Sequence, residues 1–522
     1  MNASIFPKAS PCDDRSPPSV FDVIIIGAGF AGIGMAIALR KAGHESFLVL
    51  ERSATVGGTW RDNTYPGCAC DIPSFLYSYS FEPRANWSRL YPSQPEILNY
   101  LGECVAKYRL SVNIQFETEI VEASYCESEQ DWSITAKTGK RYRSRFLVSA
   151  MGGLNRPSLP QIEGLERFQG ATFHSSAWRH DLDLSGRRVA VVGTGASAIQ
   201  IIPELAKKVE SLRVYQRTPP WILPRADRAI GPWEKRIYET IPGALRLLRN
   251  RIYLRQEMLG LGFVRRTQIL GRAETLGLRF LERSVPDAAL RARLTPRYRM
   301  GCKRILISND YFPALGRPNV ELIDAPIVRF TKESIVTAEG ERPTDVVVFA
   351  TGFRATDLLS PLRILGRGGA DLNSVWQAGA HAYLGMTVPC FPNLFLLVGP
   401  NTGLGHNSIV FMIEAQVRYV MSCLALASRK GARAIEVRQD VEADFNERLQ
   451  KDMSRTIWAT GCQSWYMDDR GKNVTLWPGF TFTYFFRTWR AKSADFRLSW
   501  KEGLPGANFN PAADYRTIRP ND

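Results

Sequence analysis

The sequence lacks the features that mark membrane-spanning and secreted proteins. It holds no stretch of about 18 uninterrupted apolar residues, so we expect no transmembrane helix and no stable membrane insertion. The first 20 residues contain proline, serine and aspartate without an apolar core. We therefore expect no signal peptide and interpret residues 1–20 as a disordered lead-in. The final residues match no common targeting or lipid-attachment signal.

Metal-ligand clusters and redox cysteine pairs are also lacking. The five histidines show no metal-ligand spacing and the nine cysteines include no CxxC pair, so we predict no metal site and no thioredoxin-type motif. Cys68 and Cys70 are separated by one residue, which leaves too short a loop for an easy disulfide, and we interpret them as small packing residues. Scattered, unpaired thiols are typical of a reducing compartment, which favours the cytoplasm.

Positive charge is in excess but is not concentrated. Lysine and arginine total 67 against 51 aspartate and glutamate residues, for a net charge of +16. Basic residues are densest between Arg225 and Arg304, where they are mixed with leucine, isoleucine and tyrosine, as on a solvated helical surface. The chain has no run of five or six basic residues. We therefore predict no nucleic-acid partner, although the positive field would attract an anionic dinucleotide.

A first dinucleotide-binding motif follows the first apolar run. Residues 23–26 are continuously apolar, as in a buried parallel strand, and lead into a GxGxxG turn and an apolar helix. A second strand over 47–50 ends at Glu51, where a carboxylate can accept hydrogen bonds from a ribose. The glycines permit a tight turn and close approach of a pyrophosphate to the helix N-terminus. We predict that FAD binds here, through Gly27, Gly29, Phe30, Ala31, Gly32 and Glu51.

A second dinucleotide-binding motif lies near the middle of the chain. Residues 189–192 predict a strand, a GxGxxA turn and a helix follow, and a further strand ends at Tyr215. No acid stands at the ribose position, and Arg217 is there instead. A guanidinium can pair with a 2′-phosphate that a carboxylate would repel, so this site favours NADPH over NADH. The predicted contacts are Gly193, Thr194, Gly195, Ala196, Ser197, Ala198, Arg217 and Thr218.

Two dinucleotide-binding folds in one chain of 522 residues predict hydride transfer between a nicotinamide and a flavin. The expected fold class is α/β, with two Rossmann-like domains, the second inserted in the first, and a helical insertion. Strand-like runs that end in glycine at residues 146–152 and 346–352 indicate the two joins. We expect an FAD-binding domain over 21–155 and 350–522, and an NADPH-binding domain over 156–349 with helices at about 225–295.

Two further segments carry a family resemblance. The first is Gly57-Gly58, Trp60, Tyr65-Pro66-Gly67 and Asp71, in which Trp60 stands where a disulfide reductase would carry its first cysteine. The second is an FxGxxxHxxxW pattern formed by Phe168, Gly170, His174 and Trp178, which departs from the family only in the Arg179 that follows. The chain resembles the type I Baeyer–Villiger monooxygenases, class B flavoprotein monooxygenases, from Phe21 to about Phe496.

The resemblance implies an enzyme that uses FAD, NADPH and O2 to insert one oxygen atom beside a ketone carbonyl, through a C4a-peroxyflavin, giving an ester or lactone. It implies that Arg304, held by Asp71, keeps the peroxide anionic, because an arginine stays charged at any working pH. By the same resemblance Lys303 reaches the 2′-phosphate beside Arg217, and the segment from Phe168 to Trp178 is a hinge. Further implied cofactor contacts are Gly58, Thr59, Trp60, Tyr65, Asp71, Tyr77, Thr351, Gly352 and Asn401, and residues 464–466, Trp477 and Phe480 belong to the substrate pocket.

Several alternatives stay open at this stage. Arg304 can be a surface ion-pair residue, Asp71 a turn or N-cap residue, His174 a hydrogen-bonded core histidine and Trp477 a core residue. An N- or S-oxygenating flavin monooxygenase shares the cofactors, but Trp60, Asp71, Trp178 and Arg304 together argue against it. An NADPH-dependent flavin reductase without oxygen insertion and a non-enzymatic NADPH sensor are the other candidates. Cyclic, aromatic, steroidal and long-chain ketones all fit, and the oligomeric state is left open.

Overall fold

A computed structural model describes residues 19–265, 267–462 and 464–500. Most of the predicted lead-in lies outside the described residues. Its last two residues, Ser19 and Val20, instead begin strand β1 (Ser19–Ile26) and pair in parallel with β6 (Arg141–Ser149). The prediction of a lead-in over 1–20 is therefore wrong for residues 19 and 20. Strand pairing is made by backbone hydrogen bonds, which do not require the continuous apolar run by which the strand is recognised.

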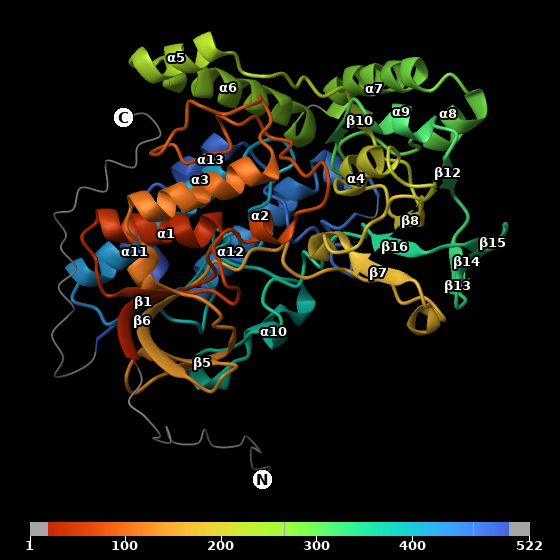
Figure 1. Cartoon of the computed structure of the whole chain (residues 1–522). Coiled ribbons are helices and arrows are strands. Elements are labelled where there is room, and N and C mark those ends of the chain that lie inside the picture. The colour runs from red at the N-terminus through yellow and green to blue at the C-terminus, as the bar shows by residue number, and fades with distance from the viewer. Residues whose placement is uncertain (1–18, 266, 463, 501–522) are drawn as a thin grey trace.

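The first unit is built on an eight-stranded sheet. Its order is β17-β4-β5-β6-β1-β2-β3, with β18 beside β6. The other strands are β2 (Phe47–Leu50), β3 (Ile114–Gln115), β4 (Ile120–Cys126), β5 (Asp131–Ala136), β17 (Arg363–Leu365) and β18 (Leu394–Leu396). Helices α1 (Phe30–Lys41), α3 (Gln94–Lys107) and α11 (Ile409–Arg429) lie together in this unit (Figure 1). Strands β1, β2, β6 and β18 are parallel neighbours, so their carboxyl ends meet at one edge.

The second unit is a five-stranded parallel sheet of order β12-β9-β8-β16-β7. Its strands are β7 (Ala171–His174), β8 (Arg188–Val192), β9 (Ser211–Tyr215), β12 (Val320–Ile323) and β16 (Val346–Phe349). Helices α4 (Ala198–Leu205) and α9 (Tyr311–Leu315) pack against each other beside it. A small antiparallel sheet of β13 (Ile327–Phe330), β14 (Ser334–Thr337) and β15 (Gly340–Pro343) extends from its edge in Figure 1.

The connections confirm the predicted fold class. The chain leaves the first sheet after β6, builds all five strands of the second sheet, and returns to the first sheet at β17 and β18. Both units have the strand–turn–helix–strand arrangement of a Rossmann-like fold, and the second is inserted in the first. Consecutive parallel strands require a crossover over the sheet face, which is why a helix follows the glycine-rich turn in each unit.

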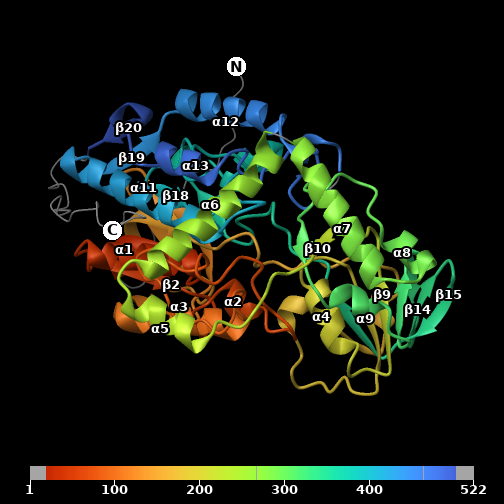
Figure 2. The ribbon, with the colours of Figure 1, turned by 90° about the horizontal axis from the view of Figure 1, so that it is seen from above.

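Helices fill the predicted insertion and reach back to the first unit. They are α5 (Pro232–Thr240), α6 (Ala244–Val264), α7 (Leu270–Ser284) and α8 (Ala288–Leu294). Seen from above, α6 passes over the first unit while α7 lies over the second (Figure 2). Arg249 in α6 is buried and donates hydrogen bonds to the carbonyl oxygens of Phe75, at 2.7 Å, and Ser78, at 3.0 Å. The insertion therefore belongs to the second unit by sequence and bridges to the first by contact.

The remaining elements are short, apart from α12. They are α2 (Thr59–Asp62), α10 (Leu372–Val375), α12 (Gln439–Met453), α13 (Thr481–Arg487), β10 (Ile222–Leu223), β11 (Leu306–Ile307), β19 (Ala434–Val437) and β20 (Phe496–Ser499). Strand β10 pairs in parallel with β11, and β19 pairs antiparallel with β20.

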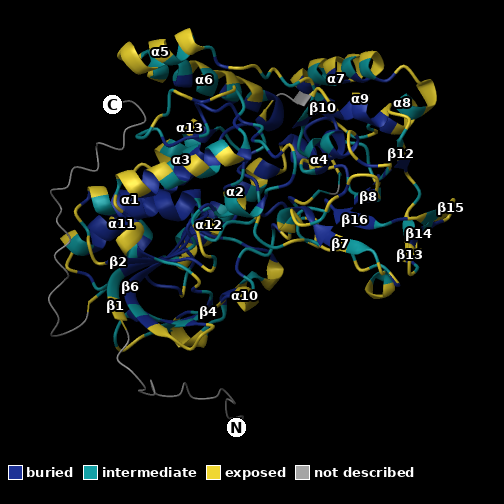
Figure 3. Ribbon diagram, viewed as in Figure 1, coloured by how far each residue is buried: buried dark blue, intermediate teal, exposed yellow. Residues whose placement is uncertain are grey.

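The buried core follows the two sheets and α1 and α11 (Figure 3). Helix α11 is the one described helix that is long and apolar enough to cross a membrane, and 78% of its most apolar 18-residue window is buried inside the protein. Burial of this kind is what a core helix shows, because a helix that is hydrophobic around its circumference needs apolar neighbours on every side.

Candidate active site

The first glycine-rich turn is a cradle that side chains would fill. Gly27 has φ +103°, a left-handed conformation that favours glycine. A Cβ on Gly32 would lie 1.8 Å from the carbonyl oxygen of Gly27, so this helix and turn pack backbone to backbone. Helix α1 starts at Phe30, with Gly29 as its N-cap and no capping side chain. Its first backbone N–H groups are therefore available to an anionic ligand such as a pyrophosphate.

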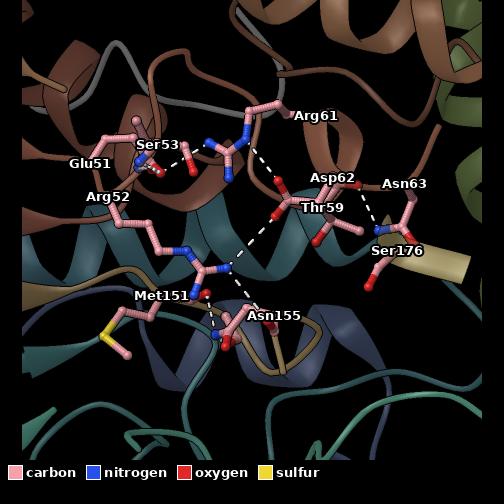
Figure 4. A network of polar contacts seen from close by, with 12 residues as sticks. Glu51, Arg52, Ser53, Thr59, Arg61, Asp62, Asn63, Met151, Asn155 and Ser176 are labelled. Atoms are coloured by element: carbon pink, nitrogen blue, oxygen red, sulfur yellow. Dashed lines mark hydrogen bonds and ion pairs between the residues drawn. The ribbon is translucent and has the colours of Figure 1, made fainter. Parts of the chain in front are cut away.

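Glu51 is fixed at the end of β2. Its buried carboxylate accepts hydrogen bonds from the backbone N–H of Ala28, at 2.8 Å, and from Arg61 Nη1, at 3.0 Å. Figure 4 shows how this network continues from Arg61 through Asp62 to Arg52. Arg52 in turn donates to the carbonyl of Asn155, where the chain leaves the first unit. The carboxylate is thus held beside the phosphate cradle, at the position expected of a ribose acceptor.

The segment after this network lies directly against the cradle. A Cβ on Gly58 would be 3.2 Å from Cα of Gly29, so the two backbones approach closely there. Thr59 begins α2, and Trp60 donates its indole N–H to the hydroxyl of Tyr77 at 3.0 Å. The ring of Tyr77 also contacts Phe30, with centroids 5.3 Å apart. These predicted cofactor contacts are therefore brought together around the start of α1.

The second cradle repeats this geometry in the second unit. Gly193 has φ +113°, and a Cβ there would lie 2.6 Å from the carbonyl oxygen of Ala350. Thr194 donates its hydroxyl to the carbonyl of Thr218 at 3.1 Å. Gly195 and Ala196 are exposed, and α4 begins without a capping side chain after Ser197. The turn therefore presents free backbone N–H groups to solvent, as a second pyrophosphate site requires.

Two cations stand together beyond this cradle. Arg217 is exposed and Lys303 is half-buried. Burial, and then the charge of Arg217, lower the pKa of Lys303, which shows that the two groups are neighbours. Among the described residues no carboxylate lies within ion-pair distance of either. A pair of cations without an anion is a fitting receptor for the 2′-phosphate of NADPH.

Tyr65 lies between the two units. Its hydroxyl donates to Gln200 Oε1 at 3.1 Å, and Gln200 Nε2 donates to the carbonyl oxygen of Ala69 at 3.0 Å. A Cβ on Gly67 would lie 2.7 Å from the carbonyl oxygen of Gln200, so the segment packs tightly against α4. Gln200 was not predicted as a site residue. A polar residue on a helix face gives no sign in the sequence that a distant loop will bind to it.

Asp71 and Arg304 form the charged centre of the site. Arg304 donates to Asp71 Oδ2 from Nε, at 3.0 Å, and from Nη2, at 2.6 Å. The side chain of Arg304 is 31% exposed and that of Asp71 is 28% exposed, so a ligand can reach the pair. The charge of Asp71 raises the pKa of Arg304 further, against the opposing effect of burial. Arg304 is therefore a fixed positive charge beside the first cradle.

The residues of the hinge signature pack inside the second unit. Phe168 contacts Phe330, with ring centroids 5.5 Å apart, and Trp178 contacts Phe173 at 5.2 Å. Gly170 has no room for a side chain, because a Cβ would lie 2.4 Å from the carbonyl oxygen of Asp345. This packing places the segment along the edge of the second sheet, where β7 pairs with β16.

His174 is the last residue of β7. It is buried, accepts a hydrogen bond from the N–H of Ser176 at 3.2 Å, and its ring contacts Phe353 at 5.4 Å. Burial lowers its pKa, so it is a neutral group at working pH.

The predicted flavin contacts Thr351 and Gly352 lie after β16. Thr351 donates its hydroxyl to the carbonyl oxygen of Ser158, and the carbonyl oxygen of Gly352 accepts a hydrogen bond from the N–H of the same serine at 2.8 Å.

The predicted C-terminal site residues are largely engaged with the protein itself. Asn401 donates both amide hydrogens, to the carbonyl oxygens of Asn473, at 2.9 Å, and Leu476, at 3.0 Å. Trp477 is buried and donates its indole N–H to the carbonyl of Phe480 at 3.1 Å. Asn401 therefore fixes the loop that carries Trp477, and the pocket roles of Trp477 and Phe480 remain predictions.

One expectation about cysteine is corrected. Cys302 and Cys462 form a disulfide, with Cα atoms 6.2 Å apart. The prediction that all thiols are unpaired is wrong for these two, because no spacing rule connects cysteines 160 residues apart in sequence. Cys68 and Cys70 are buried and free, as their packing role requires. Within the described ranges, no group of three or more histidine, cysteine, aspartate or glutamate residues could hold a metal ion.

Two dinucleotide cradles in one chain, with the Asp71–Arg304 ion pair, define a two-dinucleotide flavoprotein oxidoreductase. A family model described as pyridine nucleotide-disulphide oxidoreductase matches residues 24–251. The chain is 47% identical over 465 residues to a Baeyer–Villiger monooxygenase of Pseudomonas aeruginosa, covering 88% of each chain. The chain belongs to the Baeyer–Villiger monooxygenase family.

Solved structures agree with this membership. Cyclohexanone monooxygenase from a Rhodococcus species, bound to NADP+, superimposes with a TM-score of 0.84 at 30% identity, covering 93% of this chain and all (100%) of that one. A structure described as OTEMO in complex with FAD and NADP gives a TM-score of 0.83 at 28% identity, covering 93% of this chain and 100% of that one.

Proposed function

We propose that the protein is an FAD-dependent, NADPH-consuming monooxygenase that inserts one oxygen atom from O2 beside a ketone carbonyl to give an ester or lactone. The observation that carries the proposal is the two-point hydrogen bonding of Arg304 to Asp71 at the side of the first cradle. Membership in the Baeyer–Villiger family supports the same reaction. Bound FAD and NADPH supply the activation of O2 and the hydride, which no group of the protein can supply.

The residues of both cradles fit these cofactors. For FAD we propose contacts from Gly27, Gly29, Phe30, Ala31, Gly32, Glu51, Gly58, Thr59, Trp60, Tyr65, Asp71, Tyr77, Thr351, Gly352 and Asn401. For NADPH we propose Gly193, Thr194, Gly195, Ala196, Ser197, Ala198, Arg217, Thr218 and Lys303. The support is geometric, because α1 and α4 both begin without a capping side chain, and a Cβ at Gly27, Gly32 or Gly193 would collide with backbone atoms.

Arg304 is the residue that we assign to the chemical step. Attack on a carbonyl carbon needs a negatively charged oxygen, and a fixed guanidinium stabilises that charge without depending on pH. Asp71 orients the guanidinium through two hydrogen bonds, leaving its other N–H groups available to the reacting oxygen. The partly buried setting of the pair strengthens its field relative to water.

The division of labour between units follows the two cradles. We propose that residues 21–155 and 350–522 bind FAD, that residues 156–349 bind NADPH, and that Phe168, Gly170, His174 and Trp178 form the hinge between them. We place Trp477 and Phe480 at the substrate pocket. We propose a cytoplasmic location, which rests on the six free cysteines among the described residues and not on the Cys302–Cys462 pair.

The proposal is tested by supplying purified, FAD-loaded protein with NADPH, O2 and a panel of cyclic, aromatic, steroidal and linear ketones. We expect ketone-dependent NADPH consumption and a product that has gained one oxygen. Arg304→Ala is expected to lower product formation by about 1,000-fold, while Arg329→Ala, which removes an exposed arginine of β13, leaves it unchanged. Oxygenation of amines and sulfides alone would contradict the proposal.

A further inference from the structure

A buried tyrosine in the segment 464–466 lies beside Arg304, and no role toward Arg304 has been assigned to it above. Tyr466 is 1% exposed, and its hydroxyl has no hydrogen-bond partner among the described residues. Burial raises the pKa of Tyr466 to about 12 although the nearby charge of Arg304 lowers it, so the hydroxyl stays protonated at working pH. A buried hydroxyl without a hydrogen-bond partner destabilises the folded protein unless a neighbouring polar group bonds to it. Arg304 is the charged group that acts on it most strongly.

A disulfide ties the segment that carries Tyr466 to the segment that carries Arg304. Cys302 shortly precedes Arg304, Cys462 shortly precedes Tyr466, and their Cα atoms are 6.2 Å apart. Cys302 is 1% exposed, so the bond lies inside the protein. A covalent link this close to both side chains limits how far either can move from the other.

Packing holds the same two segments together. Tyr466 belongs to an apolar cluster formed by Phe263, Val264, Leu270, Met453, Ile457, Trp458 and Leu476, against which Ile305 packs. A Cβ on Gly301 would lie 3.1 Å from both Leu270 and Phe263, so the Arg304 segment rests on the insertion helices. The cluster thus joins three parts of the chain: α6 and α7, the Arg304 segment, and the C-terminal segment.

We propose that Tyr466 is a positioning residue for Arg304 and that the Cys302–Cys462 disulfide holds it in place. Asp71 engages Nε and Nη2 of the guanidinium, which leaves other N–H groups able to donate to the hydroxyl oxygen of Tyr466. Tyr466 then adds a second contact to the guanidinium that Asp71 already orients. The proposal rests on the proposed function for the role of Arg304 in the reaction.

The disulfide is tested first, on the intact holoprotein. Free thiols are alkylated without reductant, and the protein is digested and analysed by mass spectrometry. We expect one peptide pair linked through Cys302 and Cys462, with Cys68, Cys70 and Cys390 as free thiols. Recovery of Cys302 and Cys462 as separately alkylated peptides would overturn the disulfide part of the proposal.

The positioning role is tested by removing only the hydroxyl. Tyr466→Phe is compared with Tyr419→Phe, which changes a buried tyrosine of α11 in a different core cluster. We expect Tyr466→Phe to lower kcat for oxygenation by about 10-fold with KM for NADPH unchanged, and to divert NADPH toward hydrogen peroxide. Equal effects of the two variants, or a change in KM alone, would contradict a positioning role.

The clamp has a readout that needs no turnover. Amide hydrogen exchange of a peptide spanning residues 299–306 is compared between wild type, the double variant Cys302→Ser and Cys462→Ser, and the control Cys390→Ser. We expect exchange about tenfold faster in the double variant only, because the loop loses its covalent anchor. Unchanged exchange would overturn the clamp. If wild type oxidises no ketone, the proposed function fails, whereas the exchange experiment still decides whether the disulfide holds the loop.

Discussion

Arg304 owes its orientation, but not its charge, to its neighbours. A guanidinium is protonated at any working pH, so Asp71 is not needed to charge it. What Asp71 contributes is direction, through two hydrogen bonds to one carboxylate oxygen at 3.0 and 2.6 Å. We propose the same division at the second cradle, with charge from Arg217 and Lys303 and direction from the glycine-rich turn. Single substitutions therefore separate the recognition of NADPH from the chemical step.

The Arg217–Lys303 pair is predicted to select NADPH. In Arg217→Gln we expect KM for NADPH to rise about 10- to 100-fold, because a charge-assisted contact to the 2′-phosphate contributes about 1.5–3 kcal/mol. KM for NADH is expected to stay within about twofold, since NADH lacks that phosphate. The measurement is initial NADPH and NADH oxidation at saturating ketone, with Arg329→Gln as the control. Equal increases for both nucleotides would mean that Arg217 holds the fold and not the phosphate.

At the scale of elements, the turn before α1 depends on one glycine. We expect Gly32→Ala to abolish FAD retention, because its Cβ would lie 1.8 Å from the carbonyl oxygen of Gly27. Gly102→Ala, in α3, meets nothing within 4 Å and is expected to be stabilising by about 0.5–1 kcal/mol. Flavin absorbance after gel filtration and urea unfolding test the two variants. Normal FAD content in Gly32→Ala would refute the close packing of this turn.

His44, which follows α1, is predicted to make stability depend on pH. Burial lowers its pKa from 6.5 to about 4. Between these values the unfolded chain binds a proton that the folded protein does not, so the free energy of unfolding decreases as pH falls through this window. Above pH 6.5 His44 is neutral in both states and the full free energy of unfolding is retained. Protonation of His44 in the unfolded chain at lower pH reduces it by about 1–3 kcal/mol. We expect His44→Gln to flatten urea-unfolding free energies between pH 6.5 and 4.5, whereas His180→Gln, at an exposed site, leaves the slope as in wild type.

Elements and their order could be predicted from the sequence because each rests on local patterns. The apolar run of β1, the glycines of the turn and the helix after them lie within about one βαβ unit, so neighbours in sequence determine them. Contacts between distant segments could not be predicted in the same way. The Cys302–Cys462 disulfide joins segments 160 residues apart, and the Tyr65–Gln200 bond crosses between units. Other cysteines, tyrosines and glutamines of the chain are of the same residue types, so residue type alone does not identify these partners.

The site shows the same limit. Asp71 and Arg304 were predicted through family motifs, not by any physical pattern that brings them together. Asn401 is proposed as a cofactor contact, and no sequence pattern indicated that both its amide hydrogens are donated to the carbonyl oxygens of Asn473 and Leu476. A motif identifies a residue type at a position, whereas hydrogen-bond partners depend on the folded arrangement of several loops.

At the scale of the whole molecule, α6 joins the two units through a buried carboxylate. Glu257 accepts hydrogen bonds from Asn407 Nδ2, at 2.6 Å, and from the hydroxyl of Thr481, at 2.6 Å. Burial acts to raise its pKa, but nearby His406, 3.6 Å away, and the hydrogen bonds from Thr481 and Asn407 hold the pKa below its usual value. A charged acceptor thus anchors the insertion to the loops of the first unit.

Removing this carboxylate is predicted to loosen the bridge. In Glu257→Ala we expect the free energy of unfolding to fall by about 2–4 kcal/mol, because several buried donors lose their acceptor. Glu282→Ala, at an exposed position of α7, is expected to change it by less than about 0.5 kcal/mol. Urea unfolding followed by flavin fluorescence gives both values. Matching stabilities would show that packing of α6, and not Glu257, joins the units.

The origin of the inserted oxygen tests the account most directly. Purified, FAD-loaded protein is given NADPH and an accepted ketone under 18O2 in ordinary water, and the product is analysed by mass spectrometry. The account predicts an ester or lactone that carries one 18O atom at the inserted position, at a rate that Arg304→Ala reduces by about 1,000-fold. Consumption of NADPH with all label in hydrogen peroxide, or a product labelled only from water, would contradict it.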